Sequence, residues 1–78
     1  MTTEDRRLVA EAIAAHLGRA GRSRRWLSEH SGIAYSTLRR RMQGRSDFTI
    51  TELADIALAL DLSPAALVPS PRDTSADS

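Results

Sequence analysis

The chain has 78 residues, of which 41% are hydrophobic and 27% charged, and its formal net charge is +1. This length suits one small domain with a thin core, and the composition is typical of a soluble globular chain. The absence of cysteine excludes disulfides, thiolate zinc sites and thiol nucleophiles, and the longest apolar run, Ile56 to Leu60, is far shorter than the roughly 20 residues that cross a bilayer.

The first half of the sequence predicts three helices. Apolar residues at three- and four-residue spacing indicate a helix over residues 5–17, which Gly18 and Gly21 break. Ser23 is a suitable N-cap for a short second helix, from residue 24 to about residue 30, and Gly32 ends it in a sharp corner. A third helix runs over residues 34–43 and stops at Gly44.

Two further helix starts follow in the second half. Thr49 and Glu52 have the spacing of a capping box, and the next apolar residues follow a helical pattern up to Leu60. Ser63 and Pro64 indicate a final one-turn helix that ends near Val68. No segment alternates with the period of a strand. We therefore expect an all-α fold of five short helices, with a domain over residues 1–68 and a disordered acidic tail over residues 69–78.

The charges are unevenly distributed along the chain. All eleven basic residues are arginines, and residues 19–45 hold eight of them against one acid, Glu29, so this segment carries +7. Residues 1–18 carry −1 and residues 46–78 carry −5. A basic middle between acidic flanks favours a polyanionic partner, because the guanidinium fork matches a phosphate in two bonds. The alternative is a solvated surface rich in arginine.

The third predicted helix carries the most specific pattern. Leu38 and Met42 lie on one side of a helical wheel, while polar residues lie on the other and Tyr35 lies at the edge. The outward residues are Ser36, Arg39, Arg40 and Gln43. The major groove of DNA admits one such helix, and arginine can bind guanine O6 and N7 together. At the start of the preceding helix, Ser23, Arg24 and Arg25 could hold phosphates, with Arg45 doing so at the far end.

Residues 23–62 resemble the lambda-repressor/Cro-like helix-turn-helix family of phage and bacterial regulators. The resemblance rests on an ordered set: Leu27, Gly32, Ile33, Thr37, Leu38, Gly44, Leu53, Ile56, Ala57, Leu60, Asp61 and Leu62. It implies a compact five-helix domain in which helices two and three form the helix-turn-helix. It also implies that Tyr35, Ser36, Arg39 and Arg40 read bases. The phosphate contacts are then expected from Ser23, Arg24, Arg25, Thr37, Gln43 and Arg45.

Five residues depart from the family pattern, namely Ser28, Ser31, Ala34, Arg41 and Trp26, and the last two bear most on the site. Arg41 occupies a position that the family keeps apolar, so its side chain must reach solvent or pair with an acid on the first helix, such as Glu11. Trp26 stands where the family has a polar residue, and packing is the favoured interpretation over a contact with DNA.

Together these features predict a sequence-specific double-stranded DNA-binding regulator, most simply a repressor. So small a domain reads few base pairs, so we expect a homodimer at least on DNA. Leu62, Leu67 and Val68 either form the dimer contact or close the core. The alternatives are an antitoxin-like or phage modulator protein whose tail binds a protein partner, and a binder of RNA or acidic protein without sequence preference.

No enzyme is expected, since the glycines cannot form GxGxxG or a P-loop and HExxH is missing. No cofactor, metal or membrane association is expected either, and the polar start after Met1 favours a cytoplasmic location.

Overall fold

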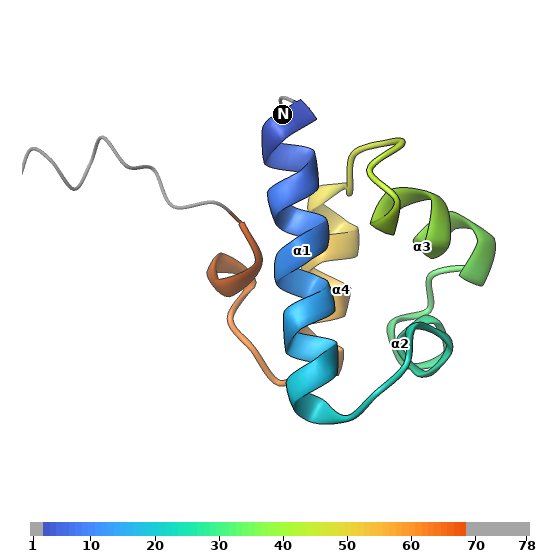
Figure 1. Ribbon diagram of the computed structural model, residues 1–78. Coiled ribbons are helices and arrows are strands. Elements are labelled where there is room, and N and C mark those ends of the chain that lie inside the picture. The colour runs from blue at the N-terminus through green and yellow to red at the C-terminus, as the bar shows by residue number, and fades with distance from the viewer. Residues whose placement is uncertain (1–2, 69–78) are drawn as a thin grey trace, which may run out of the picture.

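The computed structural model describes residues 3–68, which form four α-helices and one short 3-10 helix (Figure 1). In chain order these are α1 (Thr3–Ala20), α2 (Arg24–Ser31), α3 (Tyr35–Met42), α4 (Ile50–Ala59) and the 3-10 helix η1 (Pro64–Leu67). The described residues contain no strand, so the expectation of an all-α fold is confirmed for that part of the chain. The tail predicted for residues 69–78 lies outside the described residues.

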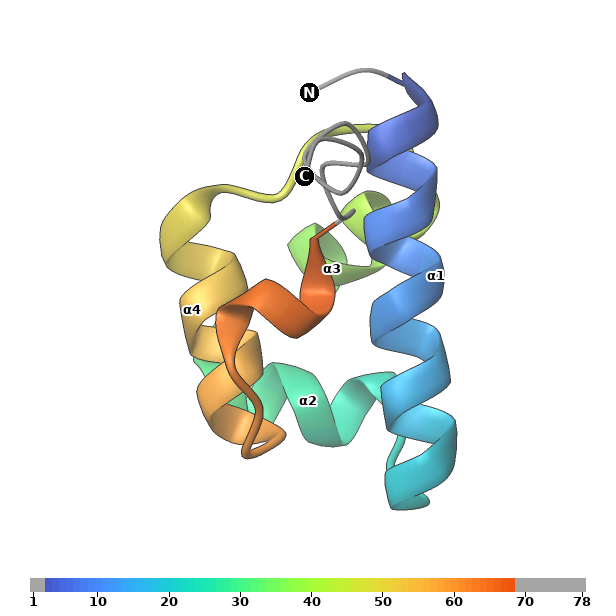
Figure 2. The ribbon, with the colours of Figure 1, turned by 90° about the vertical axis from the view of Figure 1, so that its left-hand side faces the viewer.

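The helices enclose one small core. Figures 1 and 2 show α1 and α4 on opposite sides of the molecule. Helix α2 lies across the lower end in both views, and α3 lies next to it. Helix α2 packs on both α3 and α4, while η1 packs on α4 and α1. Each element supplies buried apolar side chains to a single cluster, whose largest fully buried members are Val9, Ile13, Leu27, Leu38, Ile56 and Leu67.

The predicted helix caps are present. Ser23 accepts a hydrogen bond from the Trp26 backbone N–H at 3.1 Å and so begins α2. Thr49 Oγ1 accepts from the Glu52 N–H at 3.0 Å, while the Glu52 carboxylate accepts from the Thr49 N–H at 2.9 Å, which completes the capping box of α4. These bonds satisfy backbone donors that have no partner inside the helix.

Helix α1 is longer than the sequence pattern indicated. The prediction that Gly18 breaks it was wrong, because the helix continues to Ala20 and Gly21 is the residue that turns left-handed, with φ of 67°. The Arg22 N–H bonds back to the Leu17 carbonyl at 3.0 Å and the Gly21 N–H to the Gly18 carbonyl at 3.2 Å. This is the bonding of a Schellman motif, so one glycine three residues later ends the helix.

The last element closes the core. The predicted one-turn helix is a 3-10 helix, begun by a hydrogen bond from the Ala65 N–H to Ser63 Oγ at 3.3 Å. Leu67 is completely buried, and Leu62 packs partly buried against the core, whereas Val68 remains exposed. Within the described residues, no helix is long and apolar enough to span a membrane.

Candidate nucleic-acid interface

A three-residue turn joins α2 to α3 and fixes the two helices against each other. Gly32 takes a left-handed conformation with φ of 81°, and its N–H bonds to the Ser28 carbonyl at 3.1 Å. The Ser28 hydroxyl donates to the Ile33 carbonyl at 2.6 Å, and Ser31 Oγ accepts from the Ile33 N–H at 3.3 Å. Leu27 and Leu38 are completely buried on the two helices. The turn is therefore held by side chains as well as by packing.

The outer side of α3 forms a shallow polar hollow of about 190 Å³. Five of the sequence-predicted site residues line it: Ser36, Arg39, Arg40, Gln43 and Arg45. Arg45 Nη1 donates to Gln43 Oε1 at 2.9 Å, which holds the end of the hollow together. The lining contains three guanidinium groups and no acid, so the hollow is suited to an anionic or oxygen-rich ligand.

Tyr35 lies at the start of α3 and is held by the neighbouring helix. The Arg25 guanidinium lies over the Tyr35 ring, 4.7 Å from its centroid, in a cation–π contact. Tyr35 is half-buried, whereas Arg25 is exposed. Two predicted site residues from different helices thus act as one unit beside the hollow.

The remaining predicted residues lie elsewhere. Ser23 and Arg24 line a second, open hollow of about 520 Å³ at the start of α2, with Leu17 of α1 and Met42 of α3 among its walls. Ser23 is already engaged as the cap of α2, while Arg24 is exposed. Thr37 is half-buried and lines neither hollow. The structure therefore gathers seven of the predicted residues around two hollows, pairs Arg25 with Tyr35, and leaves Thr37 outside these sets.

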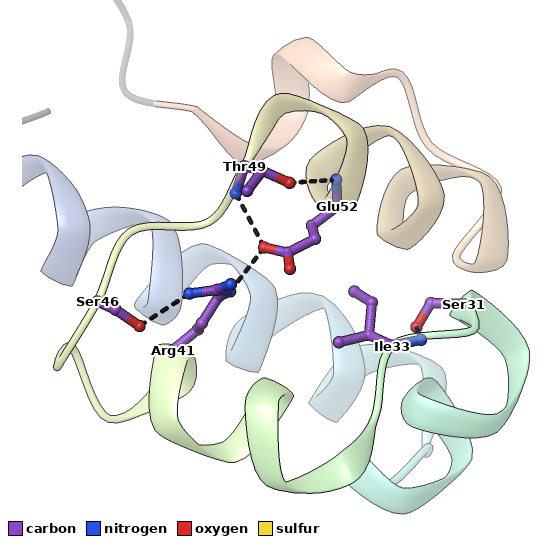
Figure 3. Close-up of polar contacts among 6 residues, drawn as sticks. All are labelled: Ser31, Ile33, Arg41, Ser46, Thr49 and Glu52. Atoms are coloured by element: carbon purple, nitrogen blue, oxygen red, sulfur yellow. Dashed lines mark hydrogen bonds and ion pairs between the residues drawn. The ribbon is translucent and has the colours of Figure 1, made fainter.

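Arg41 has a different partner from the one suggested by the sequence. Its Nε lies 2.7 Å from Glu52 Oε1, and its Nη1 donates to Ser46 Oγ at 2.9 Å (Figure 3). Glu11, the suggested acid, instead accepts from Arg7 at 2.8 Å on the same helix. The correction follows from the direction of the side chain, which points from α3 toward the start of α4 and not toward α1. Glu52 was recognised in the sequence only as a capping residue.

Trp26 is engaged within the chain. It packs partly buried against the core, the Arg22 guanidinium lies 4.8 Å from its ring centroid, and the His30 ring stacks on it at 4.3 Å. This agrees with the packing interpretation of Trp26. Arg22 and His30 were not singled out in the sequence for this role, although the four-residue spacing of His30 from Trp26 on one helix is a signal for such a contact.

Fold and site together define a small all-helical domain with an arginine-lined outer surface on its third helix. The chain belongs to the BetR domain family, which matches residues 4–77. No curated protein and no solved structure matches the chain.

Proposed function

We propose that this protein is a sequence-specific double-stranded DNA-binding regulator, a repressor of the phage or bacterial Cro type, rather than an enzyme. In this proposal α2 and α3 act as a helix-turn-helix, and α3 enters the major groove. The observation that carries it is the hollow on α3, because five residues expected from sequence to contact DNA share its lining.

The dimensions and chemistry of α3 support this role. An α-helix of eight residues is about 12 Å long, so it presents roughly two turns to the bases of one groove. Arg39 and Arg40 are exposed on consecutive positions, where each can bind guanine O6 and N7. Ser36, one turn earlier, adds a hydroxyl that can donate or accept.

The proposal assigns two kinds of DNA contact to these residues. Tyr35, Ser36, Arg39 and Arg40 read bases, whereas Arg24 and Arg45 hold phosphates on either side of the groove. Arg25 is a further phosphate contact in this proposal, because a guanidinium stacked on a ring keeps its N–H edges free to bind a phosphate.

Selection of bound duplexes from a random library tests the proposal. A specific binder enriches a common site and prefers it over random duplex by about 10³–10⁷ at physiological salt. Equal binding to random duplex or to RNA would contradict it. Deleting residues 69–78 tests the alternative of an antitoxin-like or modulator protein, since a plain repressor keeps its operator affinity without them.

Two arginine variants then distinguish residues that contact bases from residues that contact phosphates. Arg40→Ala should cost about 1–3 kcal/mol of operator affinity and relax discrimination at one position of the site. Arg24→Ala should weaken binding to all DNA sequences by the same factor. It should also lower the slope of log affinity against log salt by about one. Arg7→Ala is the charge-matched control, because Arg7 is occupied by Glu4 and Glu11 on α1.

A further inference from the structure

Helix α4 has an exposed apolar side in addition to its buried one. Leu53, Ile56 and Ala57 face the core, whereas Ile50 and Leu58 are 85% and 81% exposed. Ala54, halfway between these two, is also exposed. We call Ile50, Ala54 and Leu58 the α4 ridge. Residues four apart lie on one side of a helix, so the three side chains form a continuous row.

The α4 ridge is symmetric about its central residue. A bulky side chain stands four residues before Ala54 and another four residues after it. Two such rows complement each other around a two-fold axis, since each Ile50 can meet the other copy's Leu58 while the two small alanines allow the helices to approach. We propose that the α4 ridge docks on the α4 ridge of a second copy of this chain, an inference that rests on the proposed DNA-binding function.

The size of the ridge indicates how strong this association is. A stable interface buries about 800 Å² on each partner, and one ten-residue helix of about 15 Å offers only part of that area. Asp55 and Asp61 lie beside the ridge, and residues 46–68 contain no basic side chain to offset them. The free protein is therefore mainly monomeric, and the contact forms when two copies are held on adjacent half-sites.

The position of α4 is compatible with simultaneous DNA binding. Figure 2 shows α4 at the left edge of the molecule and α3 behind the centre, so α4 does not cover the outer side of α3. Contact through α4 leaves the arginine-lined hollow of each copy open. The buried position of Leu67 inside one copy agrees with a dimer contact located elsewhere.

Cysteine crosslinking tests the contact directly, because the chain has no cysteine of its own. If the helices cross at residue 54 with axes about 9–10 Å apart, the two facing Cα atoms, each about 2.3 Å from its axis, are about 4.4–5.4 Å apart, within the roughly 4.4–6.8 Å that a disulfide spans. Under oxidising conditions the full-length Ala54→Cys chain should form a crosslinked dimer on a two-site duplex, and weakly at high protein concentration without DNA. Ala15→Cys, at an exposed position of α1, should not.

DNA binding measured on one and on two half-sites completes the test. Leu58→Glu should leave affinity for a single half-site unchanged and lower affinity for the two-site duplex by at least about tenfold, whereas Ala15→Glu should change neither. Absence of the Ala54→Cys crosslink both with and without DNA, or unchanged two-site binding by Leu58→Glu, would overturn the docking surface. Crosslinking without any preferred duplex would support the surface and count against the proposed function alone.

Discussion

Arg41 of α3 and Glu52 of α4 form an ion pair in which the two side chains are only 17% and 16% exposed. Within residues 3–68 the Arg41 Nε hydrogen has no well-aligned hydrogen-bond acceptor although Glu52 Oε1 is 2.7 Å away, so the contact is an ion pair rather than a directed hydrogen bond. Glu52 Oε1 also accepts from the Thr49 N–H, which makes one carboxylate both the cap of α4 and the anchor of α3. The orientation of α3 therefore depends on the start of α4.

Removing the charge of Glu52 should destabilise the fold. Glu52→Gln keeps the shape of the side chain and leaves the Arg41 guanidinium without its counter-charge in a poorly solvated place. We expect the free energy of unfolding to fall by roughly 2–4 kcal/mol, a little under the range for fully buried pairs. Urea unfolding measures this change in the free energy of unfolding. Glu4→Gln, which breaks an exposed pair with Arg7, is the control and should cost under about 1 kcal/mol. Equal losses in the two variants would contradict the role given to Glu52.

Helices α3 and α4 end in the same backbone conformation but with different residues at the left-handed position. Gly44 after α3 and Asp61 after α4 have φ of 78° and 61°, and both ends have the paired bonds of a Schellman motif. A Cβ at Gly44 would meet open space, so Gly44→Ala should cost about 1 kcal/mol for backbone strain alone. Asp61→Gly should stabilise the chain by up to about 1 kcal/mol by removing that strain. Thermal unfolding checks both, and a change in the same direction for the two variants would contradict this reasoning.

The sequence predicted the features that depend on neighbouring residues. The caps at Ser23 and Thr49 and the helix end at Gly32 follow from local bonding, and the outward residues of α3 follow from the position of Leu38. The partner of Arg41 could not be predicted, because a helical wheel gives a direction but not the helix that lies there. The end of α1 was ambiguous because Gly18 and Gly21 are equally able to turn left-handed, and the structure forms the closing bonds at Gly21.

The candidate site was predictable in part. The sequence placed Ser36, Arg39, Arg40 and Gln43 on one exposed side, and the structure joins them with Arg45 around one hollow. The contact between Arg25 and Tyr35 depends on how α2 and α3 cross, which spacing along one helix does not contain. The exposed α4 ridge was not recognised in the sequence, because the apolar residues of this helix were all attributed to its buried side.

Stability should fall in acid because of Asp47. Arg6 Nε donates to Asp47 Oδ1 at 2.7 Å, and this hydrogen bond lowers the pKa of the carboxyl below its ordinary value of 3.8. A lowered pKa in the folded state gives stabilisation that is present above the ordinary value and is lost as the pH falls through the folded value. Asp47→Asn should therefore lose stability near neutral pH and converge with the natural chain in acid. Arg6→Met should reproduce this profile in urea unfolding, and a pH-independent difference would contradict it.

Arg25 should act on operator binding partly through Tyr35. Its guanidinium lies 4.7 Å from the centroid of the tyrosine ring, and such a contact is worth about 0.5–1 kcal/mol at an exposed site. Losing Arg25 therefore removes a phosphate contact and also frees the ring at the start of α3. In a double-mutant cycle of Arg25→Ala and Tyr35→Leu, the losses of operator affinity should fall short of additive by at most about that amount, because part of the contact energy is already present in the free protein. Arg24→Ala combined with Tyr35→Leu is the matched control and should be additive, since the cation–π contact with the ring comes from Arg25. Additive losses in both cycles would show that Arg25 binds DNA independently of Tyr35.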